Sequence, residues 1–116
     1  MKGRFKFGCP VISIAIKTQN LEVILDTGFN GHLMLPKRLL TNLNLKKEGT
    51  LEFITANGQK VTAVVYKASI ELFGDQREIH IVETESDFPL AGMALFHDCR
   101  ILIERHRDLV EVAQTL

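Results

Sequence analysis

A short polar segment, Asp26-Thr27-Gly28, follows an apolar run and is the part of the sequence best suited to chemistry. The run Val23-Ile24-Leu25 has the aliphatic, β-branched composition of a buried strand. A carboxylate at the end of such a strand is costly to bury unless it is paired or hydrogen-bonded. Thr27 can fix a loop through its hydroxyl group, and Gly28 permits another backbone to approach closely. Asp26 is therefore a candidate acid or base, and a simple Asx turn is the alternative.

The other reactive residue types are scattered along the chain. The histidines are His32, His80, His97 and His106. None has a partner at metal-binding spacing, so neither a metal site nor a cofactor is predicted. His97-Asp98-Cys99 is the only cluster, and adjacent residues of a strand or helix point in different directions. No serine has a Gly-x-Ser-x-Gly setting, so serine hydrolysis is not indicated.

Composition limits the partners. The 116 residues include 14 basic and 14 acidic ones, and this balance indicates neither a nucleic-acid nor a membrane partner. No apolar run is long enough to span a bilayer, and Arg4, Lys6 and Gly8 interrupt any signal peptide. Cys9 and Cys99 lie outside any CxxC pattern, which indicates reduced thiols and a cytoplasmic protein.

The pattern of apolar residues indicates a single, mainly β domain over residues 1–116. Its core is expected at residues 10–104, and residues 105–116 form a tail or a dimer-interface segment. Helical structure is expected after Pro36, over residues 37–43, and in one turn near residues 93–96. Strands are expected over residues 11–16, 21–25, 32–35, 51–56, 59–73, 78–82 and 100–104.

The clearest local feature is a hairpin at Asn57-Gly58. Two alternating segments, 51–56 and 59–64, flank this pair. Asn-Gly favours a two-residue type I′ turn because both positions take positive φ. A surface β-hairpin without further function is the simple interpretation.

Three motifs in this order resemble the retropepsin-like (single-domain, clan AA) aspartic proteases. They are Ile24-Leu25-Asp26-Thr27-Gly28, the hairpin at Asn57-Gly58, and Leu90-Ala91-Gly92 followed by Met93-Ala94-Leu95-Phe96. Ile101-Leu102-Ile103 stands where the family has its closing strand. The resemblance implies a closed, barrel-like acid-protease fold with one or two short helices. It also implies an aspartic-type endopeptidase, a hydrolase.

Two residues depart from the family pattern. Phe29 follows Asp-Thr-Gly where a small residue is usual, so its ring either narrows the substrate cleft or turns into the core. Ala91 replaces a larger aliphatic residue before Gly92, which affects packing more than chemistry.

The resemblance also implies a partner subunit. The mechanism needs two carboxylates that share a proton, and this chain has a single Asp-Thr-Gly. We therefore expect a homodimer in which Asp26 and its symmetry mate activate a water molecule. Thr27 would hydrogen-bond across the dimer, and Gly28 would let the substrate backbone come near.

The remaining implied roles concern substrate binding. The hairpin residues Ile54, Ala56, Asn57 and Gly58 would form a flap over an extended peptide or protein substrate. Side-chain pockets would involve Phe29, Leu90 and Gly92, with Leu51 and Ile54 if these face inward. Two alternatives remain: a catalytically weak or inactive dimeric peptide-binding or scaffolding module of the same fold, and a small β domain whose Asp26 only completes a turn.

Overall fold

Residues 1–115 are described by a computed structural model that consists almost entirely of β-strands. The strands are β1 (Lys2–Lys6), β2 (Cys9–Ile16), β3 (Gln19–Leu25), β4 (Leu33–Pro36), β5 (Lys46–Ile54), β6 (Lys60–Leu72), β7 (Asp75–Thr84), β8 (Leu90–Ala91), β9 (Cys99–Glu104) and β10 (Leu109–Gln114). The helices are α1 (Lys37–Leu43) and two 3-10 helices, η1 (Met93–Phe96) and η2 (Arg105–Arg107). The predicted mainly β class is confirmed.

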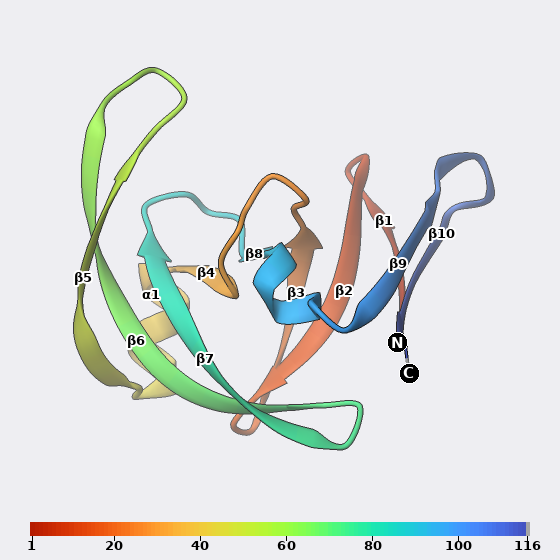
Figure 1. Cartoon of the computed structure of the whole chain (residues 1–116), viewed down its shortest axis with the longest axis horizontal. Coiled ribbons are helices and arrows are strands. Elements are labelled where there is room, and N and C mark those ends of the chain that lie inside the picture. Colours follow the sequence, from red (N-terminus) through yellow and green to blue (C-terminus); the bar gives the residue numbers. More distant parts are fainter. Residues whose placement is uncertain (116) are drawn as a thin grey trace.

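All strands belong to one strongly curved sheet (Figure 1). Their order is β5-β6-β7-β4-β8-β3-β2-β1-β10-β9. The sheet is open, because β5 and β9 form its two edges and do not pair with each other. The sheet is therefore strongly curved but does not close into the expected barrel.

The centre of the sheet joins distant parts of the chain. The short strand β8 lies between β3, to which it is parallel, and β4, to which it is antiparallel. Leu25, Leu33 and Ala91 meet there and are at most 4% exposed. The sheet therefore brings the Asp-Thr-Gly segment beside the Leu90-Ala91-Gly92 segment.

The helix predicted at residues 37–43 is confirmed. Pro36, with φ of −60°, precedes its first residue, and Asn44 ends it in the left-handed conformation. Leu40 and Leu43 bury its apolar side against the sheet. No helix within residues 1–115 has the length and apolar character needed to cross a membrane.

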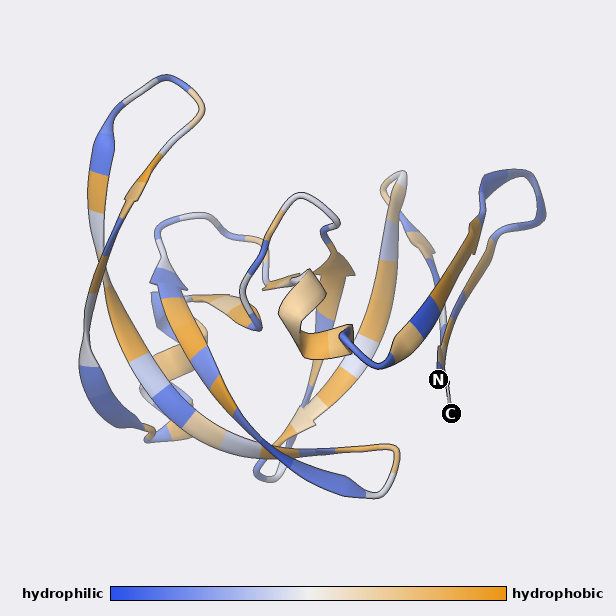
Figure 2. Cartoon of the chain, in the orientation of Figure 1, coloured by the Kyte–Doolittle hydropathy of each residue, from blue (hydrophilic) through white to orange (hydrophobic). Residues whose placement is uncertain are grey.

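The long hairpins show how the core is filled. Apolar and polar residues alternate along β6 and β7 (Figure 2). One face of these strands lies in the core, since none of its residues Ile70, Leu72, Ile79 and Ile81 is more than 3% exposed. This packing anchors the lower part of the β5–β6–β7 region while the β5–β6 turn projects away (Figure 1).

The type I′ turn predicted at Asn57-Gly58 is wrong. Gly58 has a φ of +83°, but Asn57 is not among the described residues with positive φ. The N–H of Gly58 donates to the Thr55 carbonyl (2.9 Å), and the loop contains three residues. The Asn57 side chain accepts bonds from the Thr55 hydroxyl and from the Gln59 N–H, and these bonds stabilise the longer turn.

Two-residue turns with positive φ at both positions occur elsewhere, at Phe7-Gly8 and Phe73-Gly74. The first joins β1 to β2, and β1 was not predicted. The segment 105–116 contains β10, which pairs with both β1 and β9 within the chain. The last residue, 116, lies outside the described part.

Candidate active site

Asp26 lies at the end of β3, where that strand leaves the sheet. Its N–H donates to the Ala91 carbonyl (2.9 Å), and its carbonyl accepts from the Phe29 N–H (3.2 Å). The carboxylate Oδ1 accepts a hydrogen bond of 2.9 Å from the Gly28 N–H. Asp26 is half-buried, whereas Thr27 and Gly28 are exposed. The loop therefore orients a carboxylate at the surface of a rigid sheet.

The start of η1 holds this loop from below. The N–H of Gly92 donates to the His32 carbonyl (2.9 Å), that of Met93 to Phe29 (2.8 Å), and that of Ala94 to Gly31 (3.2 Å). Backbone amides of the second motif thus satisfy carbonyls of the first. This bonding explains why the two motifs occur together.

The Phe29 ring both turns inward and lines the cleft, the two alternatives that the sequence left open. Its ring packs over two glycines: a Cβ on Gly31 would lie 2.6 Å from the ring Cζ, and one on Gly92 would lie 2.6 Å from Cδ2. The other side of the half-buried ring lines a cleft. Gly92 is buried beneath the ring and is a support rather than a cleft residue.

A cleft of about 840 Å³ lies between this loop and the β5–β6 hairpin. Its apolar lining consists of Phe29, Met34, Leu51, Phe53, Ile54, Val65, Val82 and Ala94. Gly28, whose amide binds the Asp26 carboxylate, also lines it. The carboxylate therefore lies beside a groove large enough for peptide side chains.

The structure brings three of the predicted site residues into the cleft, whereas Asp26 and Thr27 adjoin it through Gly28 and are not among its lining residues. Gly28, Phe29 and Ile54 line the cleft, and Ile54 is 69% exposed next to the β5–β6 turn that holds Ala56, Asn57 and Gly58. Leu90 does not line this cleft; it lies on β8, beside Ile24.

Three titratable residues line the cleft although the sequence did not assign them to it: His32, Glu48 and His80. His80 donates its backbone N–H to Nδ1 of His32 (3.2 Å), and its own Nδ1 lies 3.5 Å from Oε2 of Glu48. No spacing in the sequence signals this contact, because β4, β5 and β7 come together only in the folded sheet.

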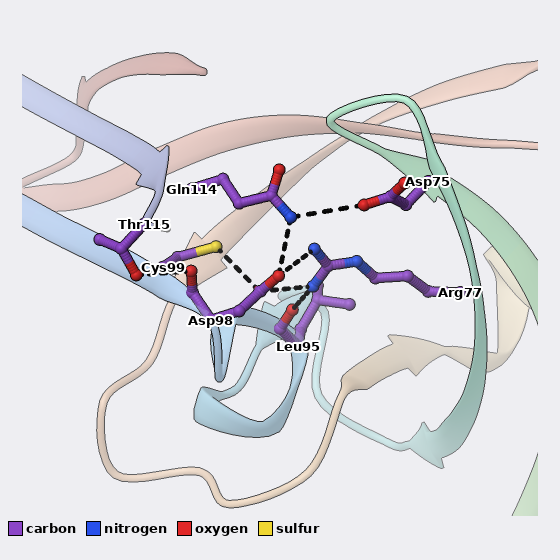
Figure 3. Close-up of polar contacts among 7 residues, drawn as sticks. All are labelled: Asp75, Arg77, Leu95, Asp98, Cys99, Gln114 and Thr115. Atoms are coloured by element: carbon purple, nitrogen blue, oxygen red, sulfur yellow. Dashed lines mark hydrogen bonds and ion pairs between the residues drawn. The ribbon is translucent and has the colours of Figure 1, made fainter.

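A second polar group fixes the far end of η1 (Figure 3). Arg77 on β7 binds both carboxylate oxygens of Asp98 (2.9 and 2.8 Å) and the Leu95 carbonyl (3.1 Å). Gln114 on β10 adds a bond of 2.8 Å to Asp98. The Arg77 guanidinium and the Gln114 amide hold the pKa of Asp98 well below its usual range.

Asp98 also connects to the end of the described chain. Its backbone carbonyl accepts bonds of 2.9 Å from both the N–H and the hydroxyl group of Thr115. Cys99 donates its thiol to the Asp98 carboxylate, and burial together with this bond raises the pKa of Cys99. A protonated thiol is a poor nucleophile. Within residues 1–115, no group of three His, Cys, Asp or Glu side chains could hold a metal ion.

Comparison with solved structures shows the fold. A retropepsin-like aspartic protease from Rickettsia conorii superposes with a TM-score of 0.67 at 24% identity, covering 94% of this chain and 85% of that one. The EIAV protease in complex with an inhibitor gives 0.66 at 18% identity, covering 78% and 86%. The foamy viral protease–reverse transcriptase, solved with an RNA/DNA hybrid, gives 0.57 at 16% identity, covering 75% of this chain and 11% of that one.

These neighbours define a class. The chain has the fold of the retropepsin-like aspartic proteases, as its motifs predict. No family model and no curated protein matches the sequence, and the identities to these three solved structures are below 25%.

Proposed function

We propose that this protein is an aspartic endopeptidase that works as a homodimer, with Asp26 of each subunit facing its mate across a two-fold axis. The observation that carries the proposal is the Asp26 carboxylate, oriented by the Gly28 amide beside a peptide-sized cleft on a retropepsin-like fold. The single Asp-Thr-Gly of the chain makes a second copy necessary.

The proposed reaction needs one ionised and one protonated carboxyl, a state that two close carboxylates adopt because their proximity separates their pKa values. The ionised Asp26 takes a proton from water while the water oxygen attacks the peptide carbonyl carbon. The mate's carboxyl donates its proton to the carbonyl oxygen, which gives a tetrahedral diol. Proton transfer to the nitrogen then breaks the C–N bond, and an acid and an amine leave.

The surface around Asp26 supports pairing of two chains. The loop after β3, the β5–β6 turn, the β1–β2 turn and the β9–β10 turn project to the same side (Figure 1). Phe7 and Ile54 on this side are 90% and 69% exposed. Within residues 1–115 the Thr27 hydroxyl has no hydrogen-bond partner, so it is available for the proposed bond across the dimer.

The β5–β6 hairpin is proposed as the flap, because its turn extends beyond the sheet and Leu51 and Ile54 line the cleft below it. A cytoplasmic location is part of the proposal, since Cys9 and Cys99 are both free thiols.

One experiment tests the proposal: a mixed peptide library is incubated with the wild-type protein and with Asp26→Asn between pH 4 and pH 7.5. We expect cleavage by the wild type and a loss of at least about hundredfold in the variant. Sedimentation at the assay concentration should show a dimer. Equal cleavage by both proteins, or cleavage by a strictly monomeric protein, would overturn it. Peptide binding without cleavage would favour a peptide-binding module.

A further inference from the structure

The groups that can carry charge in the cleft under the β5–β6 hairpin form one cluster. Among the described residues that line the cleft, they are Glu48 from β5, His32 from the loop before β4, and His80 from β7. One carboxylate and two imidazoles therefore set the charge of an otherwise largely apolar groove.

His32 does not neutralise the carboxylate. Its Nδ1 accepts the His80 N–H, so in the neutral ring this nitrogen carries no proton. The two rings lie 5.9 Å apart. Burial, followed by the nearby His80 and His97, lowers the pKa of His32. His32 is thus uncharged at neutral pH.

A β-bulge places Glu48 in the cleft. The pairing of β5 with β6 shifts register between Lys47 and Gly49, where Glu48 is the extra residue. Its Oε2 lies 3.5 Å from Nδ1 of His80, on the far side of β6. This contact is an ion pair only when His80 is protonated.

Three lysines lie on the strands around this cluster, and none forms a direct ion pair with Glu48. They are Lys46, Lys47 and Lys67. Lys67 binds Glu78 at 2.7 Å, and its pKa is raised chiefly by Glu78 and also by the more distant Glu48. Within residues 1–115 neither of the others forms an ion pair with Glu48 or lines the cleft. Among the described residues His80 is the one direct ion-pair partner of Glu48, so while His80 is neutral this carboxylate has no direct ion pair and only the more distant Lys67 as a cation.

We propose that the Glu48 end of this cleft binds a lysine or arginine side chain of the peptide substrate, a selectivity that rests on the proposed peptide-cleaving function. The apolar walls at Met34, Val65 and Val82 suit the methylene groups of such a side chain, and the carboxylate suits its charged end. When the His80 ring is protonated, its Nδ1, 3.5 Å from Oε2 of Glu48, pairs with this carboxylate and competes with the substrate. The preference for a basic side chain is therefore strongest while His80 is uncharged.

Two matched peptide pools test the inference, one with lysine and one with norleucine at each scanned position. Binding of labelled peptides to Asp26→Asn is measured by fluorescence anisotropy, and cleavage by the wild type is followed in parallel, both at pH 7.5 and pH 5. We expect lysine to be preferred roughly fivefold at pH 7.5 and less at pH 5. Adding Glu48→Gln should bring the ratio close to one, whereas Glu52→Gln, on the same strand but outside the cleft, should leave it unchanged.

The second arm concerns His80. With His80→Gln we expect the lysine preference to persist at pH 5. Equal binding of the two pools by Asp26→Asn, or a lysine preference that survives Glu48→Gln, would overturn the inference. Selective binding of lysine peptides without any wild-type cleavage would support the basic-side-chain site and overturn the peptidase proposal. Cleavage without a lysine preference would support the peptidase proposal and overturn the basic-side-chain site. Binding of neither pool would overturn both.

Discussion

Gly92 lies directly beneath the ring of Phe29, so that a Cβ on Gly92 would be 2.6 Å from the ring Cδ2. No real Cβ contact is that short. The same glycine donates its N–H to the His32 carbonyl. A Cβ there would also lie even closer to the Gly31 carbonyl oxygen and 2.6 Å from that of Phe29, so the absence of a side chain at position 92 lets both the loop backbone and the aromatic ring approach.

We expect Gly92→Ala to lower the free energy of unfolding by about 1–3 kcal/mol, because the added methyl group forces the ring or the loop to move. Urea denaturation followed by circular dichroism measures this. Gly49→Ala is the matched control: a Cβ there meets no atom within 4 Å, and Gly49 has no positive φ. Equal effects of the two substitutions would show that the close approach of the Phe29–Gly31 loop to position 92 does not matter.

The Phe7-Gly8 turn gives an expectation of the opposite sign. Phe7 has a φ of 52° and is 90% exposed, an unfavourable position for a bulky side chain. Asparagine tolerates this conformation, so Phe7→Asn should stabilise the single chain by roughly 1 kcal/mol. If Phe7 contacts a second copy, the same substitution should weaken the dimer in sedimentation. A more stable chain with unchanged dimerisation would remove Phe7 from the interface.

Asp98 should make stability depend on pH only in strong acid. Because its pKa is lowered in the folded chain by Arg77 and Gln114, its contribution is complete above the unfolded-state pKa of about 3.9. It is lost as the pH falls from there toward the lower folded value. We expect the stability gap between wild type and Asp98→Asn to be constant from pH 7 to pH 5 and to shrink below about pH 4.

Urea denaturation across this pH range measures the gap. Asp87→Asn, at an exposed aspartate that forms no ion pair among the described residues, serves as the control. A gap that stays constant down to pH 2 would contradict a role for the Arg77–Asp98 pair.

His32 gives a pH dependence of the same sign as Asp98, but at a higher pH. Its pKa is lowered in the folded chain, chiefly by burial, so below the unfolded value of about 6.5 the unfolded chain binds more protons and stability falls. His32→Gln keeps a possible acceptor for the His80 N–H and removes the titrating ring. We expect the variant to lose less stability than the wild type between pH 7.5 and pH 5.5, and His106→Gln, at an exposed histidine, to behave like the wild type.

The sequence predicts the parts of the fold that local patterns encode. Apolar alternation locates most strands, and Pro36 marks the start of the helix at 37–43. It fails for Lys2–Lys6, whose lysines and arginine hide a strand that pairs with both β2 and β10. It also fails for the turn at Asn57-Gly58, where side-chain bonds of Asn57 favour a three-residue loop.

The candidate site also has one part that the sequence predicts and another that it does not. Asp26, Gly28 and Phe29 are adjacent in sequence, so a motif can reveal them. Glu48 and His80 meet across β6 through a bulge and a strand order that no local pattern specifies. Their contact becomes visible only when the sheet is assembled.

The pairing of Lys2 with Glu111 and of Gly3 with Val110 has a consequence for biosynthesis. β1 can pair with β10 only after all of the intervening strands have been made. Likewise, β3 gains its neighbour β8 only after the intervening hairpins have been made. Such non-local pairing slows folding. A nascent chain therefore carries Asp26 without the segment that holds its loop until Ala91, Met93 and Ala94 have been made.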